Sequence, residues 1–554
     1  MSGTRRIPFA LNSGKARRDA RRVDRTLRRT ATYPHPAGRI QRIETHLSVV
    51  YLAGRYAYKI VKPVKFNFVD LTRLAQRRHC AQAECTLNRP LAGPLYLDVW
   101  PLVAHGRQCT FDSALHEHRQ RQRSDDVSLE YVVRMRRFDA HAVLSARSER
   151  YDDGLADADA LAERLARYHL HAPRHAPHTR FGSVACVAAQ CRPLLDALDA
   201  TVPSEVALHA WCSCELARIA PRLAERQANG FVRACHGDLH LDNIIRWRSG
   251  LLMFDCIEFD DALRWIDVAS DLAFAMMDFS AHDRDDCAHR LLAGWLAATG
   301  DHAALGVLPF FMVYRALVRA FAARLRGDAL DRIRYLRVAT AIAARTREVR
   351  PCLLLCHGVS GSGKSLASHA LAGRLGAIRL SSDAERKRLA GRAEVARLPA
   401  LAYTADAIDR IYEHLLVNAQ TVLENGHTAI VDATFLRERN RAEFVALAHR
   451  LGVRVIILEF VADPSTLFAR VSARVAQGRD ASDADAAVLA GQLAQAEPLT
   501  AEERVLAIRF DTAVEPTAYG SEAFWTPLLA RLSDDLLLPK ASEAAAASAR
   551  RTRS

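Results

Sequence analysis

The stretch Cys352-Leu-Leu-Leu-Cys-His357-Gly358-Val-Ser-Gly-Ser-Gly-Lys364-Ser365 decides the fold of the last third of this chain. Its apolar first half predicts a buried strand, and the glycine-rich turn that follows fits the pattern GxxxxGK[ST]. A helix-forming run, Leu366–Leu375, comes directly after it. Strand, turn and helix in this order are typical of a loop whose backbone N–H groups surround phosphate groups.

The residues of this loop have separate expected roles in nucleotide binding. Its backbone should hold the phosphates of a nucleotide, with Lys364 reaching the β- and γ-phosphates and the Ser365 hydroxyl ligating Mg²⁺. The sequence therefore predicts ATP and Mg²⁺ as cofactors. The expected nucleotide-binding set is Gly358, Ser360, Gly361, Ser362, Gly363, Lys364 and Ser365.

The segments around the loop predict its fold. Further strands are expected at 377–380, 428–431, 453–460 and 505–510, and the segments between them have helical character. Strands that alternate with helices favour a parallel sheet covered on both faces. We therefore expect a three-layer αβα domain of the P-loop NTPase class.

A charged motif follows the second expected strand, at Asp383-Ala-Glu-Arg386. Substrates of parallel α/β sheets bind beyond the carboxyl ends of the strands, where this motif lies. Asp383 could accept the proton of an attacking hydroxyl, and Arg386 could hold an anionic group or the transferring phosphate. The alternative is structural, because an aspartate before a charged helix also serves as an N-cap.

Two further features of this part suit phosphate transfer. Asp432 closes the expected strand at 428–431, where a carboxylate that organises the Mg²⁺ shell belongs. Arg470, Arg474 and Arg479 lie on a helix and loop that could close over the phosphates as a lid does. A solvated helix face would explain the arginines equally well.

A second motif lies earlier, at His236-Gly-Asp238-Leu-His-Leu-Asp-Asn243, with Phe254-Asp255 after a further apolar run. It matches H-x-D-x-x-x-x-N followed by a metal-binding aspartate. In that arrangement Asp238 accepts or orients the proton of the acceptor hydroxyl. Asn243 and Asp255 hold Mg²⁺ under the triphosphate.

An amino-terminal lobe should complete this second site. Tyr56–Ile60 is predicted to form a strand that carries Lys59 as the phosphate-pairing lysine, with Glu84 on the next helix as its partner. Lys62 is a rival for that role, although it should face the other side of the strand. No G-x-G-x-x-G precedes Lys59, since the strand pair there runs through residues 44–54 without it.

Both halves resemble known kinases at these residues. Residues 350–535, with their Asp383 to Arg386 motif, resemble small P-loop kinases of the gluconate kinase and polynucleotide 5′-kinase type. The first part resembles aminoglycoside phosphotransferases and their choline- and homoserine-kinase relatives, including a D-x-x-x-D-L-A element at Asp267–Ala273. The resemblance implies a bilobal, α+β, protein-kinase-like domain. The order of the two domains is similar to that of a bacterial two-domain family.

Composition and charge argue against a nucleic-acid-tracking protein, a membrane protein and a cysteine-ligated metal site. The net charge is +14 over 554 residues, but residues 1–30 hold ten Lys or Arg against two Asp, so much of the excess lies in a tail. A near-neutral body argues against tracking a nucleic-acid backbone. No apolar run is long enough to span a bilayer and no signal peptide is visible, so we expect a cytoplasmic protein without a membrane partner. Twelve cysteines without metal-ligand spacing are expected to be reduced thiols.

The expected domains follow from these motifs. They are a basic disordered tail at 1–35, the kinase-like domain at 36–347, the P-loop kinase domain at 350–537 and a disordered tail at 538–554.

The function expected from the sequence is a bifunctional, ATP-dependent small-molecule kinase. Each half would transfer a γ-phosphate to a hydroxyl acceptor. One alternative is a single catalytic P-loop domain with a regulatory, nucleotide-binding kinase-like domain. Another is a nucleic-acid 5′-kinase. The sequence identifies neither acceptor nor the oligomeric state.

Overall fold

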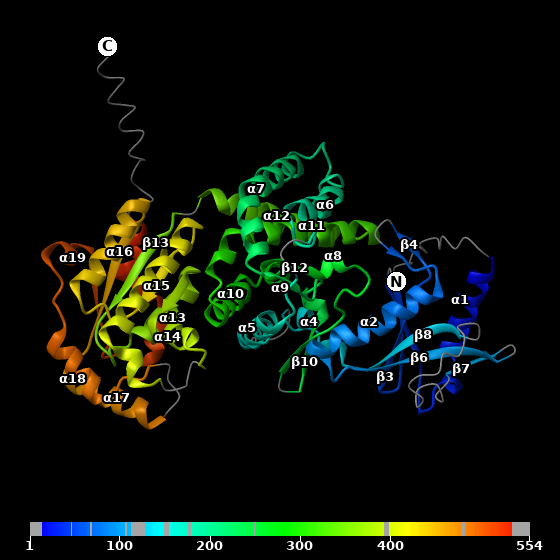
Figure 1. Ribbon diagram of the computed structural model, residues 1–554, viewed down its shortest axis with the longest axis horizontal. Coiled ribbons are helices and arrows are strands. Elements are labelled where there is room, and N and C mark those ends of the chain that lie inside the picture. The colour runs from blue at the N-terminus through cyan, green and yellow to red at the C-terminus, as the bar shows by residue number, and fades with distance from the viewer. Residues whose placement is uncertain are drawn as a thin grey trace, which may run out of the picture. The chain divides into compact units, whose positions relative to one another are not determined.

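The computed structural model describes residues 14–45, 47–66, 69–105, 108–111, 128–148, 154–175, 179–248, 250–348, 350–392, 398–477 and 482–533. By its internal contacts the chain divides into two units (Figure 1). The first comprises Met1–Trp295 with Gly306–Ala344, and the second comprises Leu296–Leu305 with Arg345–Ser554.

The first unit begins with an antiparallel sheet in the order β1-β2-β3-β8-β6-β7. Successive side chains of a strand point to opposite faces. On β3, Tyr58 therefore packs with helix α1 while Ala57 packs with helix α2. Lys59 shares the α2 face with Ala57. The elements of this lobe are α1 (Gly14–Leu27), β1 (Gln41–Glu44), β2 (Ser48–Ala53), β3 (Tyr56–Val61), β4 (Lys65–Phe66), β5 (Val69–Asp70), α2 (Leu74–Ala92), β6 (Tyr96–His105), β7 (Gln108–Phe111) and β8 (Ser128–Arg136).

The expectation of a disordered tail at 1–35 is wrong for the part that the structure describes. Helix α1 buries Val23 and Leu27 in the core beneath the sheet. Asp24 accepts hydrogen bonds from Arg42 Nε at 2.9 Å and from the Tyr51 hydroxyl at 2.6 Å. Val23 and Leu27 are four residues apart and form a narrow apolar stripe on one face of the helix. The many arginines around them made the segment resemble a solvated tail in the sequence. Residues 1–13 and 538–554 lie outside the described ranges.

A helical lobe completes the first unit and carries two short antiparallel pairs, β9 with β12 and β10 with β11. Helix α9 is buried along nearly its whole length. The lobe contains α4 (Leu144–Ser148), α5 (Gly154–His171), α6 (Val184–Leu195), α7 (Pro203–Ala228), β9 (Val232–Ala234), β10 (Ile244–Trp247), β11 (Gly250–Met253), α8 (Asp261–Arg264), β12 (Trp265–Asp267), α9 (Val268–Ala281), α10 (Asp285–Thr299), α11 (Leu308–Arg326) and α12 (Ala329–Glu348). A sheet lobe followed by a helical lobe is the predicted bilobal, kinase-like fold.

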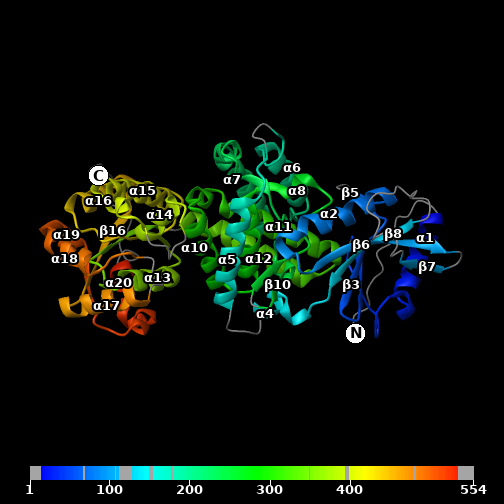
Figure 2. The same ribbon diagram turned by 60° about the horizontal axis from the view of Figure 1, so that its bottom comes forward.

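The second unit is built on a parallel sheet in the order β14-β15-β13-β16-β17. Every residue of β13 is buried, as a central parallel strand requires. Leu354 faces a core shared with α13 and α20, while α15 and α16 cover the other face (Figure 2). The three-layer αβα prediction is confirmed.

The predicted strands of this sheet fall within two residues of the observed ones. The elements are β13 (Cys352–His357), α13 (Lys364–Leu375), β14 (Ile378–Ser381), α14 (Ser382–Leu389), α15 (Ala405–Glu424), β15 (Ala429–Asp432), α16 (Glu438–Leu451), β16 (Arg454–Val461), α17 (Pro464–Gln477), α18 (Ala486–Gln495), α19 (Ala501–Leu506), β17 (Ala507–Asp511) and α20 (Glu522–Ser533).

Within the described ranges, no helix combines the length and the hydrophobicity needed to cross a bilayer. All twelve cysteines are free, and ten of them are buried. Burial raises the pKa of thiols such as Cys191 and Cys212 to about 12, which keeps them protonated and unreactive.

Candidate functional sites

The glycine-rich loop connects β13 to α13, as predicted. Gly358, Gly361 and Gly363 adopt positive φ angles of 145°, 83° and 82°. A Cβ atom on Gly361 would lie 2.9 Å from the backbone oxygen of Leu467, so this position needs glycine for its space as well as for its φ. Lys364 is nearly buried, and its ammonium donates to the Val359 carbonyl at 2.8 Å across the loop.

Asp432 lies at the end of β15, beside the start of α13. Its Oδ2 accepts hydrogen bonds from Ser368 Oγ at 3.1 Å and Arg379 Nη2 at 2.5 Å. Burial opposes its ionisation, but Arg379 and Lys364, together with a hydrogen bond from the Ser365 hydroxyl, lower the pKa of Asp432. The contacts from Ser368 and Arg379 all use Oδ2. A carboxylate and a hydroxyl are hard oxygen donors, so Asp432 and Ser365 fit a Mg²⁺ ion.

Asp383 and Arg386 lie one turn apart on α14 and form an ion pair of 3.0 Å. The alternative that Asp383 is an N-cap is wrong. Ser381 caps the helix, and its hydroxyl accepts from the Ala384 N–H. Burial and the charge of Asp432 raise the pKa of Asp383, although Arg386 opposes this. The Arg386 guanidinium carbon also lies 4.7 Å from the centre of the Tyr403 ring, a cation–π contact.

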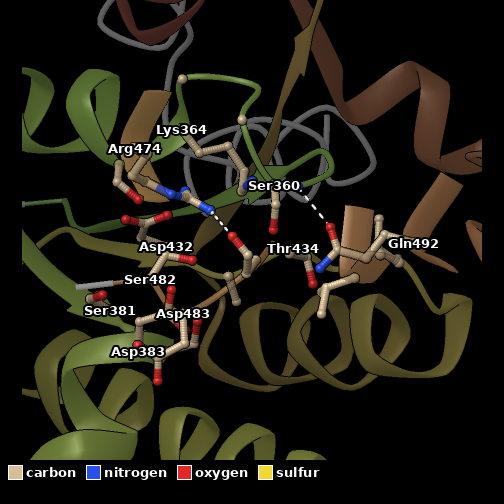
Figure 3. Close-up of a pocket in the computed structure, with 18 of the residues that line it drawn as sticks. Ser360, Lys364, Ser381, Asp383, Asp432, Thr434, Arg474, Ser482, Asp483 and Gln492 are labelled. Carbon is tan, nitrogen blue, oxygen red and sulfur yellow. Dashed lines mark hydrogen bonds between the residues drawn. The ribbon is translucent and has the colours of Figure 1, made fainter. Parts of the chain in front are cut away.

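One cavity of about 670 Å³ brings the nucleotide loop and this motif together (Figure 3). Lys364, Ser365 and Asp432 line it together with Asp383 and Arg386. These residues come from α13, β15 and α14, so the αβα fold places at one sheet edge side chains that are far apart in sequence.

Two of the three predicted lid arginines also line this cavity. Arg470 donates to the Thr512 carbonyl at 2.6 Å, and Arg474 donates to the Ala484 carbonyl at 2.8 Å. Both come from α17. Arg479 lies outside the described residues. The structure thus places two of these three arginines at the cavity, and their lid role stays a prediction.

Sequence reasoning missed several residues of this site. Asp483 accepts a hydrogen bond of 2.6 Å from Tyr403 and one of 3.1 Å from the buried ammonium of Lys387. On α18, Gln492 accepts a hydrogen bond of 2.7 Å from the Ser360 N–H. The partners of these contacts are 80 to 132 residues apart along the chain, so no local motif could reveal them.

In the first unit, Lys59 forms the predicted ion pair with Glu84, at 2.8 Å. Its ammonium also contacts Asp255 Oδ1 at 2.5 Å. Burial alone would lower the pKa of Lys59, but Asp255 and Glu84 raise it well above its usual value, so Lys59 stays charged. The rival Lys62 instead pairs with Glu44 at 2.6 Å.

Asp238 and Asn243 lie next to each other in the helical lobe. The Asn243 amide nitrogen donates to the Asp238 carbonyl at 2.9 Å and to its carboxylate at 3.2 Å. The amide oxygen therefore points elsewhere, and with Asp255 it fits a hard cation. Burial opposes ionisation of Asp238, yet His240 beside it and Arg319 lower the pKa of Asp238. An ionised carboxylate suits a group that receives a proton.

Backbone contacts hold this second loop in shape. Asp271, the second aspartate of the D-x-x-x-D-L-A element, accepts from the N–H groups of His236 at 3.0 Å and Gly237 at 2.9 Å. Asp255 itself has a φ of 63°, which is uncommon for a residue with a side chain. Glu258, which the sequence did not indicate, adds a carboxyl whose pKa is raised by burial and by the charges of Glu84 and Asp255.

One family model and several known proteins are similar to this chain. A family model described as an AAA domain matches residues 353–499. The chain is similar to a gluconokinase from Sinorhizobium meliloti 1021 (23% identity, 34% of this chain, 97% of that chain, TM-score 0.25). It is also similar to a choline/ethanolamine kinase family protein from Mesorhizobium loti (15% identity, 58% of this chain, 99% of that chain, TM-score 0.31).

Fold and sites define a protein with a bilobal, kinase-like unit followed by an αβα unit that carries a P-loop. The uncharacterized protein Rv2004c of Mycobacterium tuberculosis is 30% identical over 471 residues, which are 81% of this chain and 89% of that protein. The chain belongs to the same family as this mycobacterial protein.

Proposed function

We propose that this protein is an ATP- and Mg²⁺-dependent phosphotransferase with two sites. Each site transfers the γ-phosphate of ATP to a hydroxyl of a small molecule. The observation that carries the proposal is the cavity of the second unit, where Lys364, Ser365 and Asp432 share one space with Asp383 and Arg386. A nucleotide-phosphate site and a proton acceptor are both needed for transfer to a hydroxyl.

In the second unit the loop binds the triphosphate, and Lys364 places its charge on the terminal phosphates. Mg²⁺, held by Ser365 and Asp432, would neutralise phosphate charge. Asp383 receives the proton of the acceptor hydroxyl as the acceptor oxygen bonds to the γ-phosphorus. The bond from that phosphorus to the bridging oxygen breaks and ADP leaves. The raised pKa of Asp383 makes its carboxylate a better base at neutral pH.

In the first unit Asp238 has the corresponding role. Lys59, positioned by Glu84, pairs with the phosphates, and Asn243 and Asp255 would hold Mg²⁺. The low pKa of Asp238 means that it acts chiefly by orienting the acceptor hydroxyl and takes the proton late in the transfer.

A specific observation also favours a second candidate function, in which the first unit only binds nucleotide and regulates. Lys59 is engaged by Asp255, and the β2–β3 hairpin (Ser48–Ala53 paired with Tyr56–Val61) carries no glycine-rich cover for a γ-phosphate. In that case Asp238→Asn would leave all acceptor-stimulated turnover intact.

The test is ADP release by the full-length protein with sugars, amino alcohols, nucleosides, aminoglycosides and 5′-hydroxyl oligonucleotides as acceptors. We expect stimulation by at least two small molecules. Lys364→Ala should lower one of these activities by about 10²–10³-fold, and Asp238→Asn should remove another. Loss of every activity in Lys364→Ala, with folding retained, would show that only the second unit turns over. Stimulation by oligonucleotides alone would replace the small-molecule proposal with a nucleic-acid 5′-kinase.

A further inference from the structure

A glutamine on α18 reaches into the phosphate-binding loop. Gln492 Oε1 accepts a hydrogen bond of 2.7 Å from the backbone N–H of Ser360, the third residue of the loop (Figure 3). Ser360 is 8% exposed and lines the cavity. Its N–H belongs to the set of backbone donors with which such a loop holds phosphate oxygens. Gln492 therefore occupies a backbone donor of the loop that we expect to bind the phosphates.

Packing fixes the position of Gln492 relative to the loop. Leu489, which is fully buried, packs with Leu467 and Val471 of α17. Val359, the second residue of the loop, packs against this cluster. Leu489 and Gln492 are three residues apart and so lie on the same face of α18. The helix thus presents Gln492 to the loop from an anchored position.

The other end of the same segment is attached to the acceptor side of the cavity. Asp483 accepts hydrogen bonds from Lys387 of α14, from Tyr403 and from the Leu398 N–H, the last at 2.9 Å. Lys387 follows Arg386 directly. Residues 482–495 therefore link the helix that carries Asp383 and Arg386 to the loop expected to bind the phosphates.

We propose that Gln492 is a gating residue whose amide oxygen competes with a phosphate oxygen of ATP for the Ser360 N–H. Nucleotide binding breaks the contact between Gln492 and Ser360 and releases this end of residues 482–495, so the position of α18 reports whether nucleotide is bound. Phosphate wins the competition because hydrogen bonds to a charged oxygen are about twice as strong as those to a neutral one. The inference rests on the proposed nucleotide-binding role of this site.

The test is the affinity of the full-length protein for Mg²⁺-adenylyl imidodiphosphate, a non-hydrolysable ATP analogue, measured by calorimetry. The binding that Lys364→Ala removes is assigned to the P-loop site. At that site Gln492→Ala should increase the affinity for the analogue by about 2- to 12-fold, because one competing hydrogen bond with a net value of about 0.5–1.5 kcal/mol is gone. Gln492→Glu should weaken binding by at least about tenfold, because a carboxylate keeps the contact with Ser360 and repels phosphate.

A matched control comes from the same helix. Leu493 lies beside Gln492 on α18, is 40% exposed and is not among the residues that line the cavity, so Leu493→Ala should leave the affinity unchanged. The gating role is overturned if Gln492→Ala weakens binding, which would mean that its amide donates to the nucleotide, or if it matches Leu493→Ala. If Lys364→Ala removes no binding, the proposed function of the site fails and the gating role fails with it.

Discussion

His357, the last residue of β13, should make the second unit lose stability as the pH falls from about 6.5 to 4. The imidazole is 9% exposed, and its Nδ1–H donates to the Phe435 carbonyl at 3.1 Å. Burial and then the positive charges of Arg441 and Lys364 lower the pKa of His357 to about 4. The folded protein therefore holds this histidine neutral well below the pH at which an unfolded chain protonates it.

The sign and size of the effect follow from proton linkage. Below pH 6.5 the His357 imidazole binds a proton in the unfolded chain, whereas in the folded chain it stays neutral down to about pH 4. The contribution of neutral His357 to the free energy of unfolding is thus fully present above pH 6.5 and is lost as the pH falls. Between an unfolded pKa of about 6.5 and a folded pKa of about 4, the loss at pH 4.5 is about 2.5 kcal/mol.

His357→Asn supplies the perturbation, because the asparagine side chain can keep a donor near Nδ1 but does not titrate. The assay is hydrogen exchange of peptides covering β13 and β15 in the full-length chain, at pH 7.5 and pH 4.5. Intrinsic exchange changes equally in both proteins, so the difference between them isolates His357. We expect the opening free energy of the wild type to fall by about 2.5 kcal/mol relative to the variant.

The exposed His449 on α16 gives the control, and His449→Asn should follow the wild-type profile. Parallel pH profiles for the wild type and His357→Asn would refute the reasoning, because they would mean that His357 titrates alike in the folded and unfolded chains.

Three further outcomes are expected. Asp483→Asn leaves the buried ammonium of Lys387 without its carboxylate, and it should lower the unfolding free energy in urea titrations by about 3 kcal/mol. The double variant Asp483→Asn with Lys387→Met should regain most of that free energy. Gly361→Ala places a Cβ against a backbone oxygen of α17 at a φ of 83°, and we expect a lower melting temperature and loss of nucleotide binding. In a Lys364→Ala background, Asp255→Asn should abolish the remaining Mg²⁺-dependent nucleotide binding by calorimetry, and unchanged binding would contradict the kinase-like assignment.

Much of the second unit could be predicted because its signals are local. The apolar run of β13, the glycine spacing and Lys364 lie within one short stretch, and the fixed geometry of strand, turn and helix leaves little freedom there. The same holds for Asp238 and Asn243, whose spacing within one loop brings their side chains together. Periodicity then predicted each remaining strand of the parallel sheet to within two residues.

The prediction of a disordered tail at 1–35 failed because it was based on charge, whereas a narrow apolar stripe determines the structure there. The arginines around Val23 and Leu27 favoured a solvated tail, although these two residues pack into the core of the sheet. The cap of α14 was missed for a related reason. Ser381 and Asp383 are both good caps by residue type, and only the actual start of the helix decides between them.

By itself, then, the sequence determined the two fold classes, the phosphate-binding loop and the two short motifs with their acidic residues, because each depends on spacing within a few residues. Only the tertiary structure decided that Asp255 reaches Lys59 from 196 residues away and that Gln492 reaches Ser360. Such contacts depend on how sheets and helices pack, and a side chain that meets its partner through packing leaves no periodic or local trace in the sequence.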